Sequence, residues 1–188
     1  MFLLPNRLLL IRYKLNELKM CIRKLYLKKL GMEIGINSTI GKIYVPSPNS
    51  VKIGHNCEIR KGSSFWVQSP FNTQNGIVVG DNTFLGEKIE FNCCGQIIIG
   101  NNCLIASNVI FVDSKHTFFR SENIQDQPID IQPIIVNDDV WIGSGAILLK
   151  GVTIGKGAIV GANSLVNKNI PSYEIWAGSP ARKIGERK

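Results

Sequence analysis

Aliphatic residues recur at every sixth position through the C-terminal part of this 188-residue chain. A period of six fits neither an α-helix, with 3.6 residues per turn, nor the simple alternation of a β-hairpin. It predicts a short strand and a turn, repeated so that every sixth side chain points into one continuous core. The unbroken series comprises Val136, Ile142, Leu148, Ile154, Val160 and Val166.

Looser copies of this pattern extend back to residue 34: Ile34 and Ile40; Ile53, Ile59 and Phe65; Val79, Leu85 and Phe91; Ile99, Ile105 and Phe111. Three hexads, about 18 residues, would close one triangular coil of a β-solenoid. Residues suited to turns with unusual φ and ψ fall between the strands: Gly54, Asn56, Gly80, Asn82, Gly100, Asn102 and Gly155. Cys57 and Cys103 occupy the small inward position, so we expect both to be core thiols.

Two segments interrupt the period, residues 46–50 and residues 113–133. A long irregular segment inside a tight repeat is usually a projecting loop with a function. The second segment contains His116, one of only two histidines in the chain. The other, His55, lies at a corner of a regular hexad, and we expect it to be a solvated surface residue.

The segment before the repeat differs in pattern and in charge. Its apolar residues are spaced mostly by three and four, which predicts a helix ending at Gly31. Residues 1–30 carry eight basic groups and one acidic group, a net charge of +7, whereas the other 158 residues carry +1. Two interpretations stay open: a basic amphipathic helix on an anionic membrane surface, or a helix packed on the body or on a neighbouring subunit. The apolar run is too short to span a bilayer.

Composition excludes several other classes of protein. Five cysteines without a CxxC pair argue against a zinc ribbon or a disulfide scaffold, and favour a cytoplasmic setting. Two histidines cannot supply a three-histidine metal site, so we expect no metal. A nucleic-acid-binding protein would carry its basic face on the fold itself, and the body is nearly neutral, so we expect no nucleic-acid partner.

Several longer stretches carry a family resemblance. IGNNCLIASNVIF, VWIGSGAILLKGVTIGKGAIVGANSLV and NKNIPSYEIWAGSPAR resemble the galactoside, maltose and nodulation-factor members of the hexapeptide-repeat acyltransferases. FVDSKHTF followed by QPIDIQP resembles the O-acetyltransferases of capsular, colanic-acid and O-antigen synthesis. The resemblance implies a left-handed parallel β-helix. We expect a basic amphipathic helix over residues 1–31 and a β-helix domain over 32–188, with a catalytic loop at 113–133 and a C-terminal extension at 171–188.

The resemblance also assigns the chemistry. It implies transfer of an acetyl group from acetyl-CoA to a sugar hydroxyl, with His116 as the general base, since an imidazole titrates near neutral pH. The partner that orients His116 is Asp113, Glu87 or Glu90, and the residues alone do not choose among them.

Further site residues follow from matching positions. Glu87, Asn92 and Trp141 are expected at the sugar acceptor. Acetyl-CoA is expected to contact Trp141, Gly143, Ser144, Ala162, Asn167, Lys168 and Arg182. The Ser144 backbone N–H would hold the oxyanion, and the basic groups suit phosphates. One basic position of the family is Gly185 here, and Arg187 or Lys183 could take its place.

The family forms homotrimers with active sites between subunits, and we expect the same here. The leading hypothesis is an O-acetyltransferase of surface-polysaccharide biosynthesis, cytoplasmic or peripheral on the inner membrane face through residues 1–30. An N-acyltransferase of a nucleotide-linked amino sugar and a non-catalytic β-helix scaffold are the alternatives.

Overall fold

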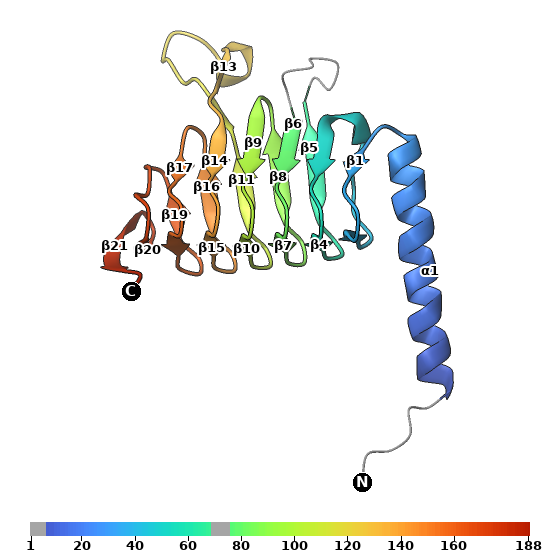
Figure 1. Cartoon of the computed structure of the whole chain (residues 1–188). Coiled ribbons are helices and arrows are strands. Elements are labelled where there is room, and N and C mark those ends of the chain that lie inside the picture. Colours follow the sequence, from blue (N-terminus) through green and yellow to red (C-terminus); the bar gives the residue numbers. More distant parts are fainter. Residues whose placement is uncertain (1–6, 69–75) are drawn as a thin grey trace.

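The computed structural model describes residues 7–68 and 76–188, with the backbone alone for residues 7 and 8. One long helix, α1 (Arg7–Lys29), precedes a stack of coils built from three parallel sheets (Figure 1). Successive coils contribute one strand to each sheet, so each strand pairs with its equivalent in the next coil. The solenoid expected from the six-residue period is confirmed.

The strands group by sheet as follows. The first sheet contains β1 (Glu33–Ile34), β3 (Val51–Ile53), β6 (Gly76–Val79), β9 (Gln96–Ile99), β14 (Ile134–Val136) and β17 (Thr153–Ile154). The second contains β2 (Thr39–Ile40), β4 (Glu58–Ile59), β7 (Phe84–Leu85), β10 (Leu104–Ile105), β15 (Trp141–Ile142), β18 (Ile159–Val160), β20 (Glu174–Gly178) and β21 (Ala181–Glu186), the last pair being antiparallel. The third contains β5 (Ser64–Val67), β8 (Glu90–Cys93), β11 (Ile110–Val112), β16 (Ile147–Leu149) and β19 (Leu165–Val166).

Three corners join the sheets, and we number them by the order of the chain. The first corner connects the first sheet to the second, the second corner connects the second to the third, and the third corner returns to the first. A 3₁₀ turn, η1 (Pro48–Ser50), lies at the third corner of the first coil, and the hairpin β12 (Ser114–His116) and β13 (Ile129–Ile131) leaves this corner further along the stack.

The interior is a set of columns of identical or similar side chains. Phe65, Phe91 and Phe111 are fully buried and stack with ring centroids 4.7 and 4.9 Å apart. The six hexad positions from Val136 to Val166 are each no more than 1% exposed. Cys57 and Cys103 lie inside as expected, and burial raises the pKa of both thiols. The six-residue period therefore predicts the inward face correctly.

The glycines and asparagines of the first corner have different roles, although the sequence suggested unusual φ and ψ for both. At the first corner the left-handed φ values fall on Asn56, Asn82 and Asn102, and in the later coils on Asp139 and Gly157. Gly54 is needed for space instead, because a Cβ there would lie 2.7 Å from the Gly80 carbonyl carbon of the next coil. The exposed His55 accepts a hydrogen bond from the Ile36 N–H at 3.0 Å, and this confirms it as a surface residue.

Candidate functional site

The segment that carries His116 is a hairpin arm rather than an irregular loop. In the arm (residues 113–133), β12 and β13 pair antiparallel, with His116 opposite Ile129. Figure 1 shows the arm, at the label β13, projecting beyond the coils. Gln127, only 5% exposed, closes the tip: its Oε1 accepts from the Phe119 N–H at 2.7 Å, and its Nε2 donates to two tip carbonyls. The arm is therefore an ordered element with its own hydrogen bonds.

Asp113 fixes the arm to the coil stack. Its side chain is fully buried, and its two carboxylate oxygens accept from the backbone N–H groups of Cys94 and Gly95 at 2.7 and 2.8 Å. The Asp113 carbonyl accepts a hydrogen bond from the Gln132 N–H at 2.9 Å, and this bond joins the two ends of the arm where it meets the coils. A buried carboxylate with two charge-assisted hydrogen bonds is a strong anchor.

His116 is exposed, and among the described residues no hydrogen bond or ion pair engages its imidazole. The two glutamates named as alternative orienting groups lie elsewhere. Glu87 is at the second corner with Lys61 Nζ 3.8 Å from its carboxylate, and Glu90 is exposed on β8, between Ser64 and Ile110. The choice of an orienting partner for His116 stays a prediction.

The second corner forms a continuous column of backbone. In successive coils the Asn108 N–H donates to the Glu87 carbonyl at 2.9 Å, and the Gly145 N–H donates to the Ser107 carbonyl at 3.1 Å. In the last step the Asn163 N–H donates to the Ser144 carbonyl at 2.8 Å. Glu87, Ser144 and the loop around Ala162 therefore lie on one line along the stack.

Gly143 keeps this line narrow. A Cβ at Gly143 would lie 2.6 Å from the Ala162 nitrogen, so only glycine permits this close stacking. Among the described residues, no acceptor forms a hydrogen bond with the Ser144 N–H. A backbone donor at an exposed corner is able to hold a developing negative charge.

Trp141 lies beside this column on the outer face of the second sheet. It is 52% exposed and pairs with Leu104 on one side and Ile159 on the other. These side chains and Arg187 line a hollow of about 210 Å³. The Trp141 side chain is therefore accessible to a ligand and is not part of the core.

The remaining residues assigned to the CoA nucleotide are spread out. Asn167 and Lys168 are exposed at the third corner of the last coil, and Arg182 lies on β21. The two substitutes for the missing basic position are engaged in ion pairs. Arg187 binds the Asp139 carboxylate at 2.8 Å, and Lys183 binds Glu174 and Glu186 at 2.8 and 2.6 Å.

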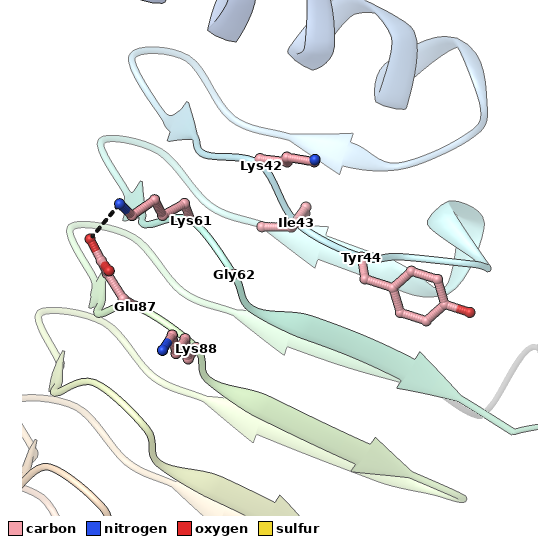
Figure 2. A pocket seen from close by; sticks show the side chains of 7 residues that line it. All are labelled: Lys42, Ile43, Tyr44, Lys61, Gly62, Glu87 and Lys88. Atoms are coloured by element: carbon pink, nitrogen blue, oxygen red, sulfur yellow. Dashed lines mark ion pairs between the residues drawn. The ribbon is translucent and has the colours of Figure 1, made fainter.

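Sequence reasoning missed a groove at the start of the second-corner column (Figure 2). It has a volume of about 460 Å³ and is lined by Lys42, Ile43, Tyr44, Lys61, Gly62, Glu87 and Lys88. The Tyr44 ring stacks with Trp66, with centroids 6.5 Å apart. Lys42, Lys61 and Lys88 come from coils of unequal length, so no fixed spacing in the sequence could have aligned them.

One chain does not bring the predicted residues together. Ser144, Ala162 and Glu87 lie at the second corner, whereas His116 lies on the arm from the third corner. The third sheet separates these corners by the five-residue step from Asn108 to Asp113, on the order of 15 Å for extended backbone. Asn92, exposed on β8 next to Val112, lies on the outer face between them. Among the described residues no cluster of three or more metal-ligating side chains is present.

Comparison with known proteins identifies the class to which this fold and corner geometry belong. The family described as "Bacterial transferase hexapeptide (six repeats)" matches residues 133–168. A putative colanic acid biosynthesis acetyltransferase of Escherichia coli is 30% identical over 136 residues, covering 72% of this chain and 69% of that protein. The chain therefore belongs to the hexapeptide-repeat acyltransferases, and its coil stack is a left-handed parallel β-helix.

Two further relatives are informative. The galactoside O-acetyltransferase of Escherichia coli is 33% identical over 127 residues, covering 66% of this chain and 62% of that protein. A mutant of AntD, an N-acyltransferase from Bacillus cereus in complex with dTDP-4-amino-4,6-dideoxyglucose and coenzyme A, shares the fold. Its TM-score is 0.74 at 24% identity, covering 88% of this chain and 89% of that one. The chain spans between 52% and 65% of the length of the first curated relatives it matches.

Proposed function

We propose that the protein is an acetyl-CoA-dependent O-acetyltransferase that acetylates a sugar hydroxyl in surface-polysaccharide biosynthesis. One observation carries this proposal: His116 is exposed on an anchored arm, while the Ser144 N–H of the second-corner column, unpaired among the described residues, lies at a different corner of the same chain. A second copy would close that gap by placing its second corner against the arm. We therefore propose a homotrimer in which each site is built from two chains.

The reaction needs three things from the protein. The His116 imidazole takes the proton of the sugar hydroxyl as that oxygen attacks the thioester carbonyl. The Ser144 N–H donates to the oxyanion of the tetrahedral intermediate. When the C–S bond breaks, the imidazolium returns its proton to the departing CoA sulfur, so the histidine ends the cycle neutral.

The other residues bind the two substrates. The pantetheine arm of acetyl-CoA would lie along the second-corner column, over Gly143 and Ala162 and beside Trp141. Asn167, Lys168 and Arg182 would meet the phosphates at the nucleotide end, where cationic donors are favourable. Glu87 and Asn92 would hold the acceptor, since carboxylate and amide groups pair with sugar hydroxyls.

The similarity to the galactoside O-acetyltransferase favours a hydroxyl acceptor, whereas the structural likeness to AntD supplies the fold alone. N-acylation of a nucleotide-linked amino sugar is the second candidate. Acetylation assays with matched hydroxyl and amino sugars separate the two.

Calorimetric titration with acetyl-CoA and with CoA tests the donor without knowledge of the acceptor. We expect one site per chain, retained in His116→Ala because that side chain acts on the acceptor proton. A folded protein that binds neither ligand at millimolar concentration would overturn the proposal and favour a non-catalytic scaffold. We further propose a cytoplasmic setting, since none of the five cysteines, all of which lie among the described residues, forms a disulfide.

A further inference from the structure

Helix α1 covers the end of the coil stack with only one of its faces. Leu27 is 5% exposed and belongs to the core, while Lys24 Nζ donates to the Ser38 carbonyl at 3.0 Å and Arg23 to the Ile40 carbonyl at 3.3 Å. Met20 is half-buried beside the same first coil. The contact is thus made by the second half of the helix, and Figure 1 shows the first half extending past the coils.

A second face of α1 is apolar and uncovered. We call Ile11, Leu15, Leu18, Ile22 and Leu25 the outer stripe; their spacing of three and four residues places them on one side of the helix. Each is between 50% and 63% exposed. Leu18 precedes the buried Leu27 by nine positions, about two and a half turns, so the stripe points away from the coils.

The charges of α1 surround this stripe. Arg12, Lys14, Lys19, Lys28 and Lys29 are all exposed, and Glu17 is the only acidic residue of the helix. An exposed apolar stripe with cationic borders matches the boundary between acyl chains and anionic headgroups. Within the described residues, no helix is long and apolar enough to cross a membrane.

The direction of the stripe argues against a second copy as its occupant. Figure 1 shows α1 lying across the end of the stack, so its outer side faces along the stacking direction. The proposed trimer, formed through the corners and sheet faces, would join the coils side by side and leave that end uncovered. Three parallel copies would then present three stripes on one end, which multiplies a weak interaction.

We propose that the outer stripe of α1 inserts into an anionic membrane surface and holds the coil stack end-on against it. This inference does not depend on the acyl-transfer chemistry. It would bring the groove at Lys42, Lys61 and Lys88, which lies on the first coils next to α1 (Figure 2), close to the lipid headgroups.

The test is co-sedimentation of the full chain with vesicles of phosphatidylcholine alone or with one quarter phosphatidylglycerol. We expect binding to the anionic vesicles that weakens as salt is raised. Leu18→Ser with Ile22→Ser should lower the partition coefficient at least tenfold. Lys14→Gln with Lys19→Gln should lower it for anionic vesicles by roughly five-fold for each charge removed.

Leu9→Ser is the matched control. Leu9 is 60% exposed on the same helix but lies on the face of Leu27, eighteen positions away and in phase with it. Its substitution should leave binding unchanged. Absence of binding at low salt, equal losses for Leu9→Ser and the stripe variant, or retained binding in the stripe variant would each overturn the proposal. So would dissociation of an oligomer by the stripe substitutions in light scattering without vesicles, since it would show that a second copy covers the stripe.

Discussion

The anchoring of the arm by Asp113 makes a prediction whose size follows from the structure. Asp113→Asn keeps the shape of the side chain and one accepting oxygen, but it turns an NH₂ group toward one of the two N–H donors at Cys94 and Gly95. Losing a charge-assisted hydrogen bond and leaving a buried donor unpaired costs about 2–4 kcal/mol. For a chain of this length, that corresponds to a fall in Tm of about 4–16 °C.

Asp81→Asn is the matched control for this change. The Asp81 Oδ1 also accepts a backbone N–H, from His55 at 2.7 Å, but at a half-exposed corner where water replaces a lost partner. We expect a cost below about 1 kcal/mol there. The assay is thermal denaturation at one fixed scan rate, together with amide exchange across residues 114–131.

The reasoning would be refuted if both variants lowered Tm equally, or if exchange in the arm stayed unchanged. The experiment also addresses the role that the sequence suggested for Asp113. If Asp113 orients His116 directly, Asp113→Asn should change the pH profile of kcat/KM. If it acts only as the anchor, activity should fall without a shift of that profile.

Three more predictions concern other parts of the molecule. His116→Gln should lower kcat by about 10²–10⁴-fold with the KM for acetyl-CoA unchanged, as steady-state assays would show; near-normal kcat would remove it as the base. Phe91→Ala should destabilise the protein by about 3–5 kcal/mol in chemical denaturation, because it empties the centre of a buried aromatic stack, while Phe84→Ala at a half-buried position should cost less. The Lys150 ammonium forms an ion pair with Asp130 and lowers the pKa of the Asp130 carboxyl. The ion pair therefore stabilises the arm above the unfolded pKa of Asp, near 4, and this stabilisation is lost as pH falls through the lower pKa of the folded state. Amide exchange of the arm should become faster over that pH range in the wild type and not in Asp130→Asn.

The sequence predicts which residues face inward but not which residues become neighbours. The hexads from Val136 to Val166 give the core directly, since a solenoid repeats one environment in every coil. The coils before them differ in length, so the alignment of Lys61 with Lys88 follows only from the backbone hydrogen bonds. For the same reason, the groove beside Glu87 could not be predicted from the sequence.

The site shows a second limit of the same kind. His116 could be proposed from its place in an interruption of the repeat, but the anchoring of Asp113 by two backbone groups leaves no trace in residue type. The exposed Ser144 N–H is also invisible in a sequence, since any residue has that group. The separation of His116 from Ser144 appears only once three hexads are folded into one triangular coil.

Complementation between inactive variants tests most directly whether the site is shared between copies. His116→Ala removes the base, and Ala162→Trp blocks the second-corner column; each variant alone should be inactive. Equal co-expression should recover about one quarter of wild-type acetyl transfer in the whole population. About three quarters of randomly assembled trimers are mixed, and about one site in three of each mixed trimer pairs an intact arm with an intact corner. Mixed trimers no more active than the parent variants would contradict the account and place the whole site within one chain.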